Sequence, residues 1–278
     1  APAPLYGRAV EAFALNPLPP SWLADALACA DPIKVIEAYA VWGGIPRYWE
    51  LAQPFGTALD DAVDALVLDP LGALHTEPDR LLLEETPSAL SLRPLLDVIG
   101  AGCNRVSEMA GRLGCPATSL ARPLSRLQEL GLVVREVPFG ESEKSCKRAF
   151  YKIVDPFFAF WFRVVAPRRG FLAGATRKAR IGLWRSFKQE LVARVWEDLS
   201  RRAVVALSAD TGADCDWHPA ARWWRGDAPE WDVVSASTDG RRGLVGEVKW
   251  SDSPFSSKEI CTIGRSLLTR ELPPGLPD

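Results

Sequence analysis

Histidine and methionine are scarce in this chain, which has two His and one Met among its 278 residues. Its six cysteines are scattered along the sequence, and none stands at the spacing of a zinc site. These features exclude the usual histidine- and cysteine-based metal centres and argue against a disulfide framework. We therefore expect reduced thiols and a cytoplasmic protein.

Other signals are missing as well. No apolar run approaches the roughly 20 residues that a membrane-spanning helix needs. The first ten residues lack the charged start and apolar core of a secretion signal. No GxxxxGKS or GxxxxGKT phosphate-binding loop occurs in the sequence. We therefore expect no membrane partner and no ATP hydrolysis by this chain alone.

The net charge of −2 hides an uneven distribution of charge. Residues 1–100 hold 5 Lys and Arg against 14 Asp and Glu, whereas residues 141–185 hold 11 against 3. A segment with a net charge of +8 in an otherwise acidic chain suggests a surface that faces a polyanion. The alternative is a solvated surface that happens to be basic.

Helical patterns dominate residues 1–87. Asp31 and Pro32 are typical of a helix start, and "PIKVIEAYAVW" then runs to the helix-ending pair Gly43 and Gly44. "SWLADALACA" and "TALDDAVDALVL" also have helical spacing, the latter with acidic residues on its polar side. We expect this part of the chain to be a helical unit.

Residues 88–153 follow the order of a winged helix: helix, helix, turn, helix and β-hairpin. The helices are expected in "SLRPLLDVIGAG", "RVSEMAGRLG" and "LARPLSRLQELG", and the strands in "LVVREVPF" and "AFYKIV". This order predicts binding of double-stranded DNA, with the third helix in the major groove and Lys144, Lys147 and Arg148 on the wing against phosphates. The alternative is a winged helix that serves only packing or protein contacts.

A connector helix is expected over residues 154–180. It contains "DPFFAFWFRVVAPRRGFL", which holds six aromatic residues together with Arg168 and Arg169. Aromatic and arginine side chains together could stack on bases and contact DNA. So many aromatics at helical spacing more often form a buried core, and we favour that interpretation for the rings.

Residues 181–278 read as a further α/β unit. A long helix is expected from Ile181 to Val204, and a strand in "AVVALSA". "EWDVVSAS" and "LVGEVKW" flank a glycine-containing turn, which predicts a hairpin within a mixed central sheet. Because side chains alternate along a strand, Glu247 and Lys249 should share one face.

The grouped charges on this hairpin need a physical reason, because isolated buried charges are costly. The hairpin can bring Asp232 beside Glu247 and Lys249. Two carboxylates can hold Mg²⁺, and a neighbouring lysine can orient the attacking water or stabilise phosphate charge. The alternative is an exposed hairpin with surface salt bridges.

These residues resemble a known catalytic motif. "PEWDVV" followed by "LVGEVKW" is similar to the PD-(D/E)xK core of the restriction-endonuclease-like nucleases. The resemblance implies a Mg²⁺- or Mn²⁺-dependent endonuclease in which Asp232, Glu247, the Val248 carbonyl and Glu230 serve the metal and Lys249 serves catalysis. Glu197, in "VWEDLSRR", matches the glutamate of that fold's first helix, although it could simply be solvated like Glu190.

A second resemblance covers most of the chain. "PLYGRA", "VWGGIPRYWE", "FFAFWFRVVAPRRG" and "ARWW" are similar to segments of archaeal-type ATPases of the AAA+/STAND class. In that family a P-loop ATPase domain precedes a helical lid, a winged helix and a nuclease-like domain. The resemblance implies a C-terminal fragment or natural truncation, with ATP acting only through a P-loop domain or partner chain.

Together these observations predict a multi-domain α+β chain. The expected units are a lid-like remnant at 1–87, a winged helix at 88–153, a connector at 154–180 and a restriction-endonuclease-like domain at 181–278. The expected function is DNA-binding, metal-dependent phosphodiester hydrolysis. The alternative is a non-catalytic DNA- or protein-binding regulatory module that keeps a degenerate nuclease fold.

Overall fold

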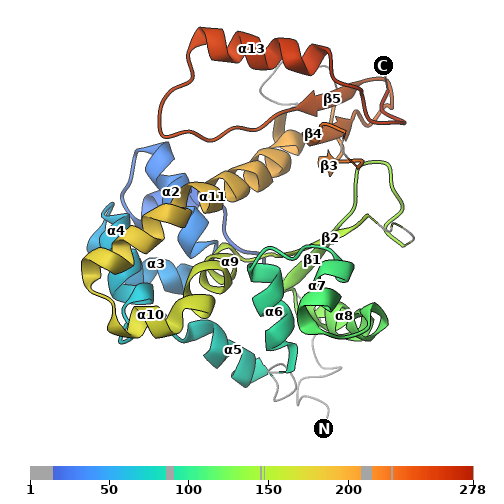
Figure 1. Cartoon of the computed structure of the whole chain (residues 1–278). Helices are drawn as coiled ribbons and strands as arrows, with labels where there is room; N and C mark the ends of the chain where they lie inside the picture. Colours follow the sequence, from blue (N-terminus) through green and yellow to red (C-terminus); the bar gives the residue numbers. More distant parts are fainter. Residues whose placement is uncertain are drawn as a thin grey trace, which may run out of the picture.

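The chain folds as a mixed α+β protein in which helices predominate and two small antiparallel sheets lie apart (Figure 1). The computed structural model describes residues 15–85, 91–144, 146, 148–207, 215–226 and 228–277. Most of the helices form one body, and α11 runs from that body to the second sheet (Figure 1). The predicted α+β class is confirmed at this level.

Short helices form the N-terminal part of the body. Proline at the first turn of α2 and α3 fixes the backbone in a helical conformation where no amide partner is needed, and the Asp31 carboxylate accepts from the Ile33 amide at 3.0 Å. The bounds are α1 (Pro20–Ala26), α2 (Pro32–Trp42), α3 (Pro46–Ala52), α4 (Leu59–Val63) and α5 (Glu77–Glu85).

Three helices and a hairpin come next. They are α6 (Arg93–Gly100), α7 (Val106–Leu113), α8 (Ala121–Glu129) and the antiparallel strands β1 (Val133–Glu136) and β2 (Phe150–Ile153). Gly114, with φ 64°, ends α7 in the left-handed conformation that favours glycine. The helices turn Leu96, Met109, Leu124 and Leu127 inward, so their apolar spacing and their burial agree.

The aromatic run between the hairpin and α11 is the centre of the core. α9 (Pro156–Phe160) continues through a π-helical turn at Trp161–Val165 and a short 3-10 turn into α10 (Arg169–Gly174). Phe157, Phe160, Trp161 and Phe162 are buried, whereas Phe171 is half exposed. One continuous apolar core therefore joins the N-terminal helices, the hairpin and α11, as the core interpretation of these rings predicts.

α11 (Arg177–Ala203) leads to a three-stranded sheet with its own small core. The strands β3 (Ala221–Trp223), β4 (Trp231–Ala236) and β5 (Gly243–Gly246) are antiparallel, with β4 in the centre. Trp223, Trp231 and Val234 form the buried cluster. The amphipathic α13 (Ser257–Leu268) follows at the edge of the molecule (Figure 1), and none of its residues is buried.

The hairpin of β4 and β5 has the predicted antiparallel pairing, with Val234 opposite Val245. Three other expectations at this end of the chain need correction. The sheet is antiparallel in the described residues, not mixed. The strand expected in "AVVALSA" is helical over its described residues 203–207, which continue α11 because Val204 is buried in the core; residues 208 and 209 lie outside the described residues. β5 ends at Gly246, so Glu247 and Lys249 lie just beyond an edge strand instead of on a central one.

Candidate functional site

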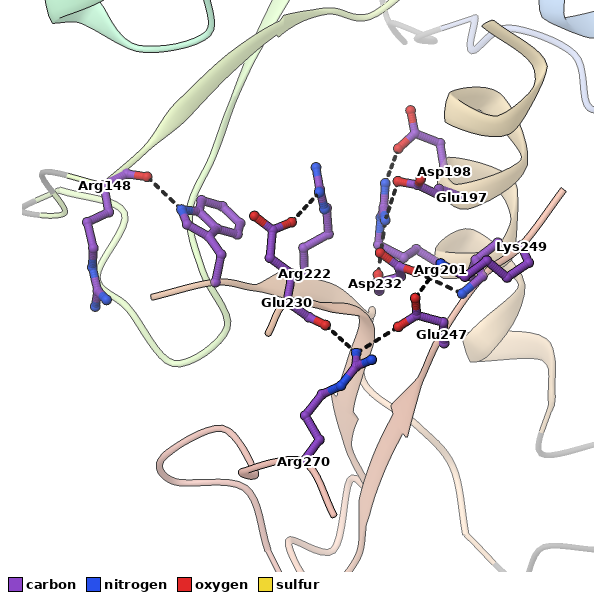
Figure 2. Close-up of polar contacts among 12 residues, drawn as sticks. Arg148, Glu197, Asp198, Arg201, Arg222, Glu230, Asp232, Glu247, Lys249 and Arg270 are labelled. Carbon is purple, nitrogen blue, oxygen red and sulfur yellow. Dashed lines mark hydrogen bonds and ion pairs between the residues drawn. The ribbon is translucent and has the colours of Figure 1, made fainter. Parts of the chain in front are cut away.

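α11 and β4 are fixed to each other by Arg201, and this contact sets the geometry of the candidate site. Arg201 Nη1 donates to the main-chain oxygen of Asp232 at 3.0 Å, and its other nitrogen pairs with Asp198 (Figure 2). The arginine side chain is only 9% exposed. Because a buried guanidinium needs partners for its donors, this arrangement holds the end of α11 against the strand.

The Asp232 side chain reaches the segment that follows β5. Its Oδ2 accepts a hydrogen bond from the Val248 amide at 2.9 Å. This contact brings residues 247–249 against β4 although they lie outside the regular strand. The amide of Val248 is the group that faces Asp232 here, so its carbonyl as a metal ligand stays a prediction.

Glu247 is paired with a cation at each of its two oxygens (Figure 2). Lys249 Nζ lies 2.5 Å from Oε1, and Arg270 Nη1 lies 2.7 Å from Oε2. Burial alone would raise the pKa of Glu247, but the hydrogen bonds from Lys249 and Arg270 outweigh it and hold that pKa below its usual value. Glu247 is therefore ionised and fully partnered.

Glu197 on α11 completes the group. Burial, and then the neighbouring Asp232 carboxylate, raise the pKa of Glu197. The pKa of Lys249 is raised, first by its hydrogen bond to Glu247 and also by the charges of Asp232 and Glu197. The structure thus brings together the predicted residues Glu197, Asp232, Glu247 and Lys249 from three separate elements.

Glu230 is turned to a different partner. Its carboxylate accepts from Arg222 Nη2 at 2.9 Å, and its main-chain oxygen accepts from Arg270 (Figure 2). The resemblance to the PD-(D/E)xK nucleases implied that Glu230 would also serve the metal. The ion pair with Arg222 on β3 instead occupies its carboxylate in this structure.

The carboxylate oxygens of this group are the type of ligand that a hard divalent cation prefers. Mg²⁺ commonly takes one or two carboxylates, with water filling its remaining positions, and Asp232 and Glu247 supply such a pair. Within the described ranges, no three His, Cys, Asp or Glu side chains are grouped so that they could hold a metal ion. A cation would therefore bind Asp232 and Glu247 only after a change of partner at Glu247.

A cavity of about 640 Å³ lies where the N-terminal helices, the β1–β2 hairpin and α11 meet. Its lining includes Tyr39, Asp155, Leu191, Glu197 and Arg222. Asp232, Glu247 and Lys249 are not in that lining. Glu197 is therefore the member of the carboxylate cluster that also lines this cavity.

The predicted wing is docked against the second sheet. Phe150 stacks on Trp224 with ring centroids 4.5 Å apart, and Trp224 Nε1 donates to the Arg148 carbonyl at 3.1 Å (Figure 2). The Arg148 side chain pairs with Glu141, whereas Lys144 is exposed. Lys147 lies outside the described residues. DNA contact by these three residues stays a prediction.

Arg168 and Arg169 have intramolecular partners. Arg168 donates to the Arg163 carbonyl at 3.0 Å and its guanidinium lies over Phe187. Arg169 pairs with Asp79 and lies over the Trp161 ring. These contacts give both arginines a role in packing the helical body, and their predicted contact with DNA is untested.

Sequence reasoning missed two sets of residues. Arg112 and Arg122 are exposed on α7 and α8. The helical spacing of the apolar residues Leu124 and Leu127, which are buried, could have predicted that Arg122 lies on the solvent face of α8. Arg270 had no local signal, because it lies 23 residues from Glu247.

Comparisons with known proteins identify relatives without an assigned activity. Residues 161–263 match the DUF234 family, described as archaea bacterial proteins of unknown function. An uncharacterized protein of Methanocaldococcus jannaschii, MJECL04, is 27% identical over 283 residues, covering 99% of this chain. The chain spans 61% of that relative's length. No solved structure matches the chain.

Among the described helices, none combines the length and apolarity needed to cross a membrane.

Proposed function

We propose that the chain is a DNA-binding, metal-dependent nuclease module of the restriction-endonuclease-like type. The observation that carries the proposal is the meeting of Glu197, Asp232, Glu247 and Lys249 at the end of α11. Grouped carboxylates beside a lysine match the chemical needs of phosphodiester hydrolysis better than those of a structural ion pair. The predicted β4–β5 hairpin supports the same assignment.

Each residue has a distinct role in this proposal. Asp232 and Glu247 would hold Mg²⁺ or Mn²⁺, which supplies phosphate charge stabilisation and a more acidic water. Lys249 would orient the attacking water and stabilise negative charge on the phosphate. Glu197, whose pKa is raised by burial and by Asp232, is suited to hold a proton or to order water beside the site.

The module from α6 to β2 is proposed as a winged helix that binds double-stranded DNA. Its third helix, α8, presents Arg122 and Arg126 to solvent, and the neighbouring α7 presents Arg112. Arg126 already pairs with Glu129 at 3.0 Å, which lowers its availability to a phosphate. Arg112 and Arg122 therefore join the wing as candidate phosphate contacts.

Control by ATP belongs to the same proposal. The resemblance to archaeal-type ATPases supports a helical lid before the winged helix and a P-loop domain elsewhere in the assembly. With no phosphate-binding loop in this sequence, ATP would act only through that domain or a partner chain. The nuclease module would then be weakly active by itself.

A second function is favoured by one observation. Both oxygens of Glu247 are paired with cations, as in a site that keeps its charges for stability. The alternative is therefore a non-catalytic module that binds DNA or protein. In this case the cluster would hold α11, β4 and the segment after β5 together without binding metal.

Nicking of supercoiled plasmid with Mg²⁺ or Mn²⁺ tests the proposal. The variants are Asp232→Ala, Lys249→Ala and, as a matched control, Asp252→Ala, whose side chain is exposed in the same domain. We expect cleavage by the wild type and the control and loss of at least about a hundredfold in the first two variants. Equal cleavage by all four proteins would identify a contaminant.

If cleavage is absent, the assay is repeated in the presence of the proposed P-loop ATPase domain or partner chain. Absence of cleavage there, together with absence of metal binding, would favour the non-catalytic alternative.

A further inference from the structure

We propose that Arg270 weakens metal binding at this site, because its guanidinium holds one carboxylate oxygen of Glu247 and competes with a divalent ion for it. The inference rests on the proposed metal site. It adds a residue from the C-terminal segment that the motif does not contain. The observation behind it is the single contact that joins Arg270 Nη1 to Glu247 Oε2 at 2.7 Å (Figure 2).

The guanidinium of Arg270 is held in place by two further contacts besides the one with Glu247. The same Nη1 donates to the main-chain oxygen of Glu230 at 2.5 Å, and the planar group lies over the Trp231 ring, 4.9 Å from its centroid. The Arg270 side chain is only 16% exposed. A stacked, hydrogen-bonded guanidinium loses little conformational freedom in holding a carboxylate, so it is a strong competitor for Oε2.

The segment that carries Arg270 is attached to the sheet at several points. Trp231 Nε1 donates to the Glu271 carbonyl at 2.9 Å. Leu276 packs so closely against Gly243 that a Cβ added to Gly243 would lie only 2.5 Å from Leu276 Cγ. Arg270 is thus presented to Glu247 by residues 270–276, which contact the first residue of β4 and, at the other end of the hairpin, the first residue of β5. Only local movement of the side chain is needed to free Oε2.

The second cation at Glu247 is placed differently. Lys249 is 50% exposed and pairs with Oε1 through a flexible stem. It can turn towards water or a phosphate while it stays beside the cluster. Arg270 is the less exposed partner, so of the two cations it is the one that keeps its Glu247 oxygen, Oε2, from a metal ion.

The charges explain why the arginine and the metal exclude each other. The Glu247 carboxylate lies between Lys249 and Arg270, and the charges of Asp232 and Glu197 also act on Lys249. A divalent ion at Glu247 would lie close to both cations, and like charges at close range repel strongly in a partly buried site. Withdrawal of Arg270 from Glu247 removes one of these two repulsions.

Mn²⁺ binding tests this inference without any measurement of cleavage. Affinity is measured by electron paramagnetic resonance and by calorimetry at one pH and low ionic strength, for the wild type, Arg270→Gln, Arg270→Lys and Arg265→Gln. Arg265 is the matched control, because it is exposed on α13 and its substitution removes the same charge. Arg270→Met, which keeps the apolar stem over Trp231, replaces Arg270→Gln if that variant does not fold.

We expect Arg270→Gln to bind Mn²⁺ about three- to tenfold more tightly than the wild type, which is the effect of removing one partly buried ion pair. Arg270→Lys should bind within about twofold of the wild type, because the competing charge is kept. Arg265→Gln should also match the wild type. Adding Asp232→Ala to Arg270→Gln should abolish the tight binding.

Two failures can be told apart. Equal or weaker Mn²⁺ binding by Arg270→Gln, in a protein whose wild type binds the ion, overturns the role of Arg270 and leaves the metal site standing. Absence of binding in every variant overturns the metal site itself and the inference with it. A gain of equal size in Arg265→Gln would show a general effect of net charge and would also overturn the inference.

Discussion

Lys152 Nζ, on strand β2, lies 2.6 Å from Oδ1 of Asp198 on α11. Asp198 also pairs with Arg201, which holds the backbone of Asp232. The hairpin of the proposed winged helix is therefore linked to the candidate site through three side chains. Burial alone would raise the pKa of Asp198, but Lys152 and Arg201 together lower it below its usual value.

Substitution of Lys152 tests this link. We expect Lys152→Ala to lower the free energy of unfolding by about 1–2 kcal/mol, because Asp198 and Glu136 both lose a partly buried partner. Urea denaturation measures the change. Arg47→Ala is the control: its pair with Glu50 has side chains 67% and 68% exposed and should contribute less than about 0.5 kcal/mol. Equal losses in both variants would mean that the link adds no stability.

Asp155 predicts a pH dependence of stability. Burial raises the pKa of its carboxyl from 3.8 to about 6, against the opposing backbone hydrogen bonds from Phe158 and Phe157. Between these two values the folded chain binds more protons than the unfolded chain. Stability contributed by this group therefore falls as pH rises from about 4 to about 6, and is lower by up to about 3 kcal/mol above that range.

Asp155→Asn removes this titration and keeps a side-chain oxygen at the start of α9. We expect the variant to be more stable than the wild type at pH 7.5 and equal to it near pH 4. Urea denaturation at pH 4, 5, 6 and 7.5 measures the difference. A difference that stays constant across these pH values would contradict the assignment to Asp155.

Gly100 packs so closely against Phe162 that a larger residue at this position would clash with the core. A Cβ at this position would lie 2.5 Å from the Cβ of Phe162 and 3.0 Å from its carbonyl carbon. We expect Gly100→Ala to cost about 1–3 kcal/mol through overpacking. Gly111 is the matched control, because it lies inside α7 with open space around it. Gly111→Ala should raise stability by about 0.5–1 kcal/mol, as expected for a helix interior. Thermal denaturation of the two variants distinguishes these effects.

Salt dependence tests whether the wing binds DNA. Charge reversal at Lys144, Lys147 and Arg148 should weaken binding to double-stranded DNA of any sequence. The slope of log affinity against log salt concentration should become shallower by about 0.9 for each phosphate that the variant no longer neutralises. Fluorescence anisotropy over a series of salt concentrations gives both values. Unchanged affinity and slope would mean that the wing does not touch DNA.

The helical face is tested separately, with Arg112→Glu and Arg122→Glu in one variant. We expect a similar loss of affinity if α7 and α8 face the phosphates. Lys258→Glu, at an exposed position on α13, is the control for a change of surface charge away from this face. A loss of the same size in the control would assign the effect to net charge instead of to this face.

Local chemistry determined much of the fold. Helical apolar spacing predicted α2, the helices before the hairpin and most of α11, because one face of each must pack against the core. The glycine-containing turn between two apolar runs predicted the pairing of β4 with β5, and the density of aromatic rings predicted the burial of Phe157 and Trp161. These patterns depend on residues close in sequence, so they can be read without coordinates.

Strand propensity and side-chain alternation failed where packing with distant parts of the chain decided the conformation. Val204 and Val205 have high strand propensity, yet they continue α11 because Val204 packs into the core. Glu247 and Lys249 are spaced as on a strand, but pairing stops at Gly246 and leaves them to bind each other. Propensity and alternation do not specify where a neighbouring strand ends.

The sequence by itself determined which charged residues were available near the β4–β5 hairpin, and their grouping could be predicted because a hairpin has a fixed local geometry. Only the tertiary structure decided their partners. Arg270 reaches Glu247, and Arg201 reaches the backbone of Asp232, across 23 and 31 residues. Such contacts depend on how separate elements pack around a shared core, and periodicity carries no information about packing at that range.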